Sequence, residues 1–144
     1  MKNTGNMQKL FLDTNIVLDF LGERKGFYEP IAKVLTMADQ KKIEVFTSPT
    51  SIGNAFYILS KYESPKSALE KIRKFKLLSS ISVMDEEVIE KAIHSDFKDF
   101  EDAMQYYSAL SANCAVIITR NEKDFKNSMI PVLSAEGYLQ TVTK

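Results

Sequence analysis

The apolar residues of the chain form two kinds of pattern that alternate along its length. Short, nearly continuous apolar runs occur at residues 9–12, 43–47, 80–84, 115–119 and 130–133, and runs of this kind predict buried β-strands. Between them, apolar residues recur three and four positions apart, which predicts helices over about 16–21, 27–38, 52–59, 65–75, 85–94 and from 99 onward. Continuous strands separated by helices favour a parallel sheet with helices on both faces.

Two of these elements carry sharper expectations. Residues 115–119 form the most convincing strand, and we expect this strand to be central in the sheet. In the helix that begins near Pro65, the expected inward side chains are Leu69, Ile72 and Phe75. The opposite face is basic and carries Lys66, Lys71, Arg73 and Lys74.

Length and composition indicate one globular domain. Of the 144 residues, 44% are hydrophobic and 26% charged, which is typical of a chain that folds by itself. We expect residues 1–8 to be a flexible N-terminal segment and residues 9–144 to be a single domain. The start of the chain lacks the apolar core of a signal peptide, and no apolar run approaches membrane-spanning length. These features predict a cytoplasmic protein without a membrane partner.

Charge, cysteine and histidine content bear on RNA binding, on the redox compartment and on a zinc site. Lys and Arg total 19, and Asp and Glu total 19, so any contact with RNA must come from local basic patches. The single cysteine, Cys114, cannot form an internal disulfide and is expected to be buried, which fits a reducing compartment. The single histidine, His94, has no histidine or cysteine partner at zinc-ligand spacing.

Acidic residues occur where ligands collect in parallel sheets. Asp13 directly follows the first predicted strand, Asp124 lies shortly after the fourth, and Asp102 belongs to an acidic run at the start of a helix. Hydrolysis of phosphodiesters with Mg²⁺ or Mn²⁺ needs converging oxygen ligands with open positions for water and phosphate. The sequence therefore suggests an acidic, metal-binding cleft.

Three segments in order resemble the most recognisable motifs of the PIN-domain family. They are residues 12–15 (LDTN), 97–103 (FKDFEDA) and 119–125 (TRNEKDF), and the resemblance extends over about residues 9–133. It implies an α/β, PIN-like three-layer domain, with a central parallel sheet of about four to five strands flanked by helices. It also implies a metal-dependent endoribonuclease that cleaves RNA, often the toxin of a VapC-type pair with an antitoxin protein, and usually a homodimer.

The resemblance assigns roles to particular positions. Asp13 and Asp102 are the expected catalytic residues and, with Asn121 and Asp124, the expected metal ligands. The expected supporting residues are Thr14, Asn15, Asn54, Asp99 and Thr119. Arg120, beside the predicted site, is the expected RNA-binding residue.

Two departures from the family pattern leave a second interpretation open. Asn54 stands where many members carry a glutamate, and Asn121 occupies a further acidic position. Amide oxygens can coordinate Mg²⁺ but bring no charge, so metal binding should be weaker unless Asp99 or Asp124 compensates. The alternative is a weakened or inactive PIN domain that serves as an RNA-binding or protein-interaction module.

Simpler structural roles compete at several positions. Asp13 and Asp99 are also good N-cap residues, and Asp124 is suited to cap the short segment after it. The basic helix face is more simply solvated than bound to RNA, and at least one of Tyr106 and Tyr107 is expected in the core. A haloacid dehalogenase-type phosphatase would need an acid at Asn15, and a receiver domain would need adjacent acids near the first strand.

Overall fold

The computed structural model describes residues 7–143, which form a five-stranded parallel sheet with helices on both sides. The strands are β1 (Gln8–Leu12), β2 (Ile43–Thr47), β3 (Ser80–Ile81), β4 (Val116–Ile118) and β5 (Val132–Leu133). Their order in the sheet is β3-β2-β1-β4-β5, and every neighbouring pair is parallel. The predicted fold class is therefore confirmed.

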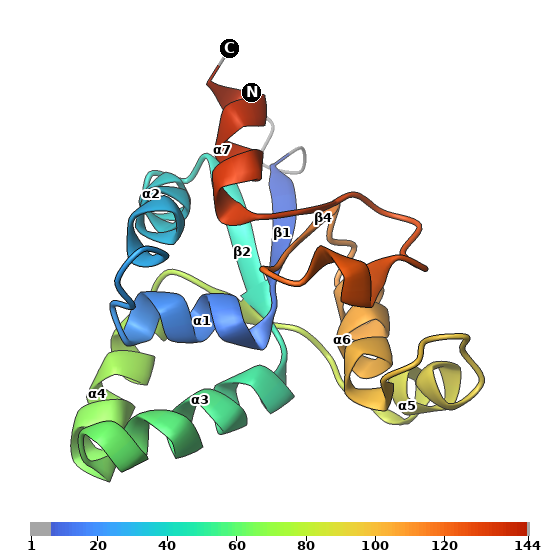
Figure 1. Cartoon of the computed structure of the whole chain (residues 1–144), viewed down its shortest axis with the longest axis horizontal. Coiled ribbons are helices and arrows are strands. Elements are labelled where there is room, and N and C mark those ends of the chain that lie inside the picture. Colours follow the sequence, from blue (N-terminus) through green and yellow to red (C-terminus); the bar gives the residue numbers. More distant parts are fainter. Residues whose placement is uncertain (1–6, 144) are drawn as a thin grey trace.

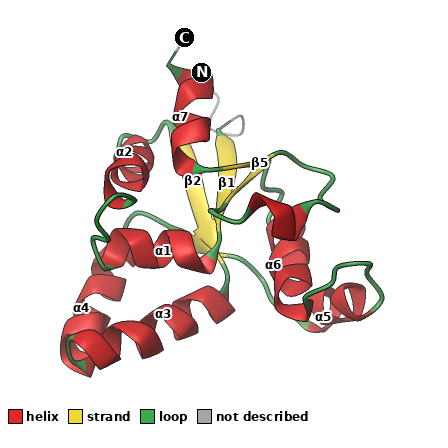
Figure 2. Cartoon of the chain, in the orientation of Figure 1, coloured by secondary structure: helices red, strands yellow, loops and turns green. Residues whose placement is uncertain are grey.

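Apart from α2, the α-helices begin at side chains that accept hydrogen bonds from the first turn. They are α1 (Thr14–Leu21), α2 (Tyr28–Asp39), α3 (Pro49–Tyr62), α4 (Pro65–Lys76), α5 (Glu86–Ile93), α6 (Phe100–Ser111) and α7 (Ala135–Val142), with a 3₁₀ turn, η2, at Glu122–Phe125. Asp13, Asp85 and Asp99 cap α1, α5 and α6, and serines cap α3, α4 and α7. Figure 2 shows these helices around the strands. None of the helices within residues 7–143 is long and apolar enough to cross a membrane.

Alternate residues of the central strands divide the core into two layers. Leu10 and Leu12 of β1 face a layer that includes residues of α1, α2, α3, α4 and α7, whereas Phe11 faces α6 and η2. Helix α5 packs against α6, on the outer side of that second layer (Figure 1). This division gives the expected three-layer arrangement.

The carboxyl ends of neighbouring strands position the site. The chain runs from β1 to β2 on one side of the sheet, and β4 lies against the other side of β1. In open parallel sheets, this change of direction leaves a crevice beyond the strand ends. Asp13 follows β1, Ser48 follows β2 and Thr119 follows β4, so all three lie at this edge.

Some details differ from the sequence-based expectations. The middle strand is β1, and β4 is interior beside it. The third strand ends at Ile81 rather than Met84, because its partner β2 ends at Thr47 and Ser82 makes the last backbone bond to it. The strand predicted at 130–133 is confined to β5.

Two further expectations concern helices. Leu69 was expected inside but is 49% exposed, because Ala68 and Phe75 occupy the inward stripe of α4 and the next residue turns toward solvent. The segment after β5 forms α7, for which the pattern had predicted no element. The strand β1 begins at Gln8, and residues 1–6 of the expected flexible segment lie outside the described residues.

Candidate active site

Asp13 is held at the end of β1 by donors from three elements. Its Oδ1 accepts from the backbone N–H of Thr14 at 2.9 Å and from Nε2 of Gln105 at 3.2 Å. Its Oδ2 accepts from the hydroxyl of Thr119 at 2.8 Å. The side chain is therefore both the predicted helix cap and a fixed carboxylate in the crevice, which makes the two interpretations of Asp13 compatible.

A buried network of hydrogen bonds among Gln105, Ser48 and Ser51 holds the carboxylate of Asp13 in place. Gln105, on α6, is only 1% exposed, and its Nε2 also donates to Oγ of Ser51 at 2.8 Å. The Ser48 hydroxyl donates to Oε1 of Gln105. Oγ of Ser51 in turn lies 2.7 Å from Oγ1 of Thr14. Because buried polar groups are costly unless paired, this network favours a single position of the Asp13 carboxylate.

Sequence reasoning missed this network. The sequence pattern predicts no role in the site for Ser48 or Gln105. A signal existed, because Gln105 follows Asp102 by three residues and so lies on the same face of α6, among residues expected to be buried. A polar amide at a buried helix position needs a partner, and that partner here is the predicted site.

Asp102 lies in the first turn of α6, as expected. Oδ1 of Asp99 accepts from its backbone N–H at 3.0 Å, so the predicted N-cap role of Asp99 is confirmed. The Asp102 carboxylate itself accepts no hydrogen bond from any residue in the described part of the chain. Its surroundings therefore contrast with those of Asp13.

The electrostatics of Asp102 reflect an accumulation of carboxylates. Burial first, and then the charges of Asp99, Asp124, Asp13 and Glu101, raise the pKa of Asp102 from 3.8 to about 7. Every charge that shifts this pKa is negative, so the carboxylates around Asp102 repel its ionised form. A bound divalent cation would relieve this repulsion.

The segment after β4 places its predicted residues differently. Thr119 is fully buried; besides its bond to Asp13, its hydroxyl accepts from the backbone N–H of Asn121 at 3.0 Å. The side chains of Asn121 and Asp124 are exposed. Asp124 lies within η2, so it does not cap a later segment as one interpretation suggested. It does act electrostatically on Asp102.

Arg120 is engaged by the protein itself. Its Nε and Nη2 donate to the two carboxylate oxygens of Asp19 at 2.9 and 3.0 Å, and Asp19 is 1% exposed. The guanidinium also lies over the ring of Phe27, with Cζ 3.9 Å from its centroid. The contacts of Arg120 thus join the segment after β4 to α1 and to Phe27.

Asn54, which stands where many family members carry a glutamate, contacts an acidic residue of α6. Asn54 is exposed on α3, and its Nδ2 donates to Oε2 of Glu101 at 3.0 Å. Glu101 is one of the charges acting on Asp102. A carboxylate of α6, from the acidic run that the sequence indicated, therefore lies beside the amide of Asn54.

Three further residues that the sequence singled out, Asn15, Tyr106 and Cys114, are half-buried or buried. Asn15 is half-buried in the first turn of α1. Tyr106 is 3% exposed and packs against Phe97 at 5.1 Å between centroids, which confirms the core role expected for at least one of the two tyrosines. Cys114 is buried as expected, and burial raises the pKa of its thiol to about 12.

A cavity of about 690 Å³ opens beside Asp102. It is lined by Asp96, Phe97, Lys98, Asp99, Asp102, Lys123, Asp124, Lys126 and Asn127. The size is within the range of about 300–1,000 Å³ usual for ligand pockets. The cavity is thus lined by carboxylates, Asp102 among them, and by three lysines.

The donor set fits a hard divalent cation better than a softer metal. Across residues 7–143, no three His, Cys, Asp or Glu side chains converge into a cage made of protein alone. Mg²⁺ keeps several waters and is often bound by one or two carboxylates together with substrate phosphate. Asp13 and Asp102, with Asp124 nearby, match that mode of binding.

Comparison with known proteins identifies the family. The family model described as a PIN domain matches residues 9–123 of the chain. The chain belongs to the PIN-domain family. It is also 30% identical over 140 residues to the protein named ribonuclease VapC1 of Aquifex aeolicus, covering 94% of this chain and 96% of that protein.

Solved structures show the same fold at lower sequence identity. A chain of VapBC2 from Rickettsia felis, determined bound to a DNA fragment from its promoter, matches with a TM-score of 0.68 and 17% identity, covering 88% of this chain and 98% of that one. VapC20 of Mycobacterium tuberculosis, a sarcin-ricin loop cleaving toxin, matches with a TM-score of 0.58 and 13% identity, covering 75% of this chain and 86% of that one.

Proposed function

We propose that this protein is a metal-dependent endoribonuclease that hydrolyses RNA phosphodiesters, and that it is the toxin of a type II toxin–antitoxin pair. The observation that carries the proposal is the meeting of Asp13, fixed by three donors, with the charge-stressed Asp102 at the carboxyl end of a parallel sheet. The similarity to ribonuclease VapC1 supports the same reaction.

The chain's own residues have distinct roles in this proposal. Asp13 and Asp102 would hold Mg²⁺ or Mn²⁺, with Asp124 and the amide oxygen of Asn121 available to complete the ligand set through water. When bound, the ion supplies Lewis-acid chemistry at the phosphate. Thr119 and Gln105 fix the orientation of the Asp13 carboxylate by their hydrogen bonds.

Supporting roles follow from the same contacts. Thr14 extends the network from Ser51 to the start of α1, next to Asp13. Asp99 holds the first turn of α6 that carries Asp102. Asn15 and Asn54 border the site from α1 and α3, and Asn54 places Glu101.

A catalytically weakened PIN domain that binds RNA or protein is the second candidate. The observation in its favour is that Asn54 and Asn121, both exposed, are uncharged where the family pattern has acidic residues. Such a protein would keep the fold and lose the metal. Metal affinity therefore separates the two candidates.

The proposed partners follow from the family. The matched chain of Rickettsia felis belongs to a VapBC complex, which supports an antitoxin protein as a partner here. We further propose a homodimer in the cytoplasm, where the RNA substrate and a reduced Cys114 would both be found. Light scattering of the purified protein would test the dimer.

RNA cleavage tests the proposal. Purified protein should cleave a mixed RNA substrate in Mn²⁺ or Mg²⁺, and excess EDTA should abolish cleavage. Asp13→Asn and Asp102→Asn should each lower the rate at least about 100-fold, because changes to residues behind a metal ligand alone cost about 10- to 100-fold. The matched control is Asp39→Asn, an exposed acid at the end of α2.

Two results would contradict the proposal. One is cleavage that survives in both active-site variants, because a contaminating nuclease would then account for it. The other is a folded wild-type protein that neither cleaves RNA nor binds Mn²⁺, which would favour the second candidate.

A further inference from the structure

Three lysines stand at the edge of the cavity beside Asp102. Lys98 belongs to the loop between α5 and α6, and Lys123 and Lys126 belong to η2 and the residue after it. All three are exposed. We call Lys98, Lys123 and Lys126 the lysine rim.

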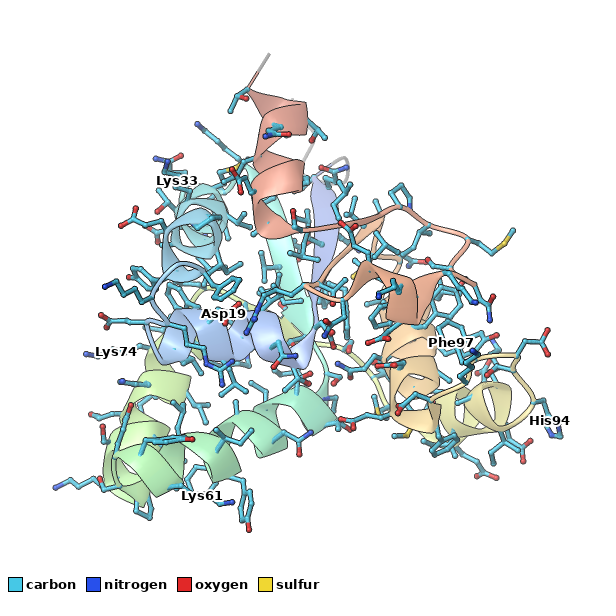
Figure 3. The ribbon with its side chains drawn as sticks, viewed as in Figure 1. Asp19, Lys33, Lys61, Lys74, His94 and Phe97 are labelled. Atoms are coloured by element: carbon cyan, nitrogen blue, oxygen red, sulfur yellow. The ribbon has the colours of Figure 1, made fainter. Side chains whose placement is uncertain are left out.

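The two segments that carry the lysine rim are joined to each other. Nδ2 of Asn127 donates to the carbonyl oxygen of Asp96 at 3.0 Å. Phe97 packs edge-on against Phe125, with 6.3 Å between ring centroids, and Phe125 is 1% exposed. In Figure 3, Phe97 lies between α5 and α6, at this side of the molecule. These contacts hold the rim in a preformed position, which limits the entropy lost on binding.

The rim lysines are not neutralised by the acids around them. Within residues 7–143, the ion pairs are made by Arg24, Lys71, Arg73, Lys91, His94 and Arg120, and none involves the rim. Exposed ammonium groups without a carboxylate partner are available to a polyanion. Arg120, in contrast, has two of its nitrogens committed to Asp19.

We propose that the lysine rim is the RNA-binding surface of this protein, where Lys98, Lys123 and Lys126 contact backbone phosphates next to the one held at Asp13 and Asp102. This proposal rests on the proposed ribonuclease function and adds the path of the substrate. The cavity of about 690 Å³ is lined by the three rim lysines and by Asp102, so a chain that enters it meets both within one hollow.

The chemistry of the rim fits this occupant. Lysines bind phosphate as point charges without reading the base, so they position a strand rather than select its sequence. The acids within the same cavity repel a polyanion when no cation is bound there, so RNA binding without metal rests on the lysines. The lysines supply attraction at the entrance, where the carboxylates are not balanced.

A comparison of two triple variants tests the proposal. The rim variant is Lys98→Gln, Lys123→Gln and Lys126→Gln. The control is Lys66→Gln, Lys74→Gln and Lys76→Gln on α4, which removes the same charge from exposed lysines that also form no ion pair. Helix α4 lies on the other side of the molecule from Phe97, as the label of Lys74 shows in Figure 3.

Fluorescence anisotropy of a labelled single-stranded RNA in EDTA measures binding without cleavage. The rim variant should bind at least about 10-fold more weakly at low salt, and its plot of log K against log salt should be shallower by about 2, because each contact to single-stranded nucleic acid contributes about 0.7. The control should keep the wild-type slope. Thermal unfolding of both variants confirms that they are folded.

Each other outcome overturns the proposal in a distinguishable way. Equal loss in both variants means that diffuse charge binds RNA, and no loss in the rim variant means that another surface does. If wild-type protein binds too weakly for anisotropy but cleaves RNA, kcat/KM of the same variants replaces the affinity. A fall in the rim variant alone then supports the proposal, and an equal value in both variants overturns it. If it neither binds nor cleaves RNA, the proposed function fails together with the rim.

Discussion

The two principal carboxylates of the site have opposite surroundings. Asp13 accepts three hydrogen bonds and is 9% exposed, whereas no donor of the described chain reaches the carboxylate of Asp102. Such a division is useful for metal binding, because one ligand is fixed in advance and the other keeps its affinity for a cation. The cost falls on the metal-free protein, where Asp102 lies near four other carboxylates.

This cost predicts a pH-dependent effect of Asp102→Asn on stability. The pKa of Asp102 is raised from 3.8 to about 7, so its destabilising effect is absent below about pH 4, grows as pH rises and is complete above about pH 7. Without metal, the variant should gain on the order of 1 kcal/mol relative to wild type between pH 4 and pH 8, after allowance for solvent screening. Thermal unfolding at both pH values measures this gain.

The comparison between pH values is the informative quantity. The charged form of an acid in the first turn of α6 also gains up to about 1 kcal/mol from the helix dipole, which offsets part of the predicted effect at pH 8 and none at pH 4. A difference between variant and wild type that does not change from pH 4 to pH 8 would show that Asp102 is not under electrostatic stress.

At the scale of secondary-structure elements, an ion pair between Arg120 and Asp19 joins the residues after β4 to α1. Asp19 of α1 is 1% exposed, accepts two hydrogen bonds from Arg120 and lies 3.5 Å from Nη1 of Arg24. Arg120 directly follows Thr119, whose hydroxyl holds Asp13. The position of the site therefore depends on this contact between elements.

The ion pair predicts that Arg120→Met destabilises the protein. The change leaves the buried Asp19 with Arg24 alone, so we expect a loss of about 2–3 kcal/mol, somewhat below the usual cost of breaking a buried pair. Thermal unfolding should show a fall of several degrees. Arg73→Met, which breaks the exposed pair with Glu70, is the matched control and should cost less than about 1 kcal/mol.

The same variant decides between two roles for Arg120. If Arg120 is mainly an RNA-binding residue, Arg120→Met will unfold at the wild-type temperature and lose affinity for RNA. If the ion pair with Asp19 dominates, stability will fall first.

Over the whole molecule, the fold was predictable because its strands are continuous apolar runs separated by helical patterns. Asp13 and Asp124 could be expected at one edge, because both come after parallel strands, whereas Asp102 in α6 was added by the resemblance to the PIN-domain motifs. The role of Gln105 and the contact of Glu101 with Asn54 could not be predicted, because they depend on which turn of α6 packs against β1 and α3. The partner of Arg120 is 101 residues away in sequence, a pairing that no local pattern contains.

The lysine rim shows the same limit. Lys98 lies in one loop and Lys126 in another, and contacts such as the packing of Phe97 on Phe125 bring the two loops together. The basic face of α4 was the more visible pattern in the sequence, because its charges repeat along one helix. A charge pattern within one element is easy to read, whereas a surface made by two loops requires the tertiary structure.

In the proposed function Asp13 and Asp102 together bind a divalent cation, and calorimetric titration of RNA-free protein with Mn²⁺ measures that binding. Wild type and Asp39→Asn should bind one ion per site, and Asp13→Asn and Asp102→Asn should each lose that binding. At about 100 times Kd, Mn²⁺ should also stabilise the wild type by about 2.7 kcal/mol. Unchanged Mn²⁺ binding in both active-site variants, or no binding in the wild type, would contradict the proposed metal binding.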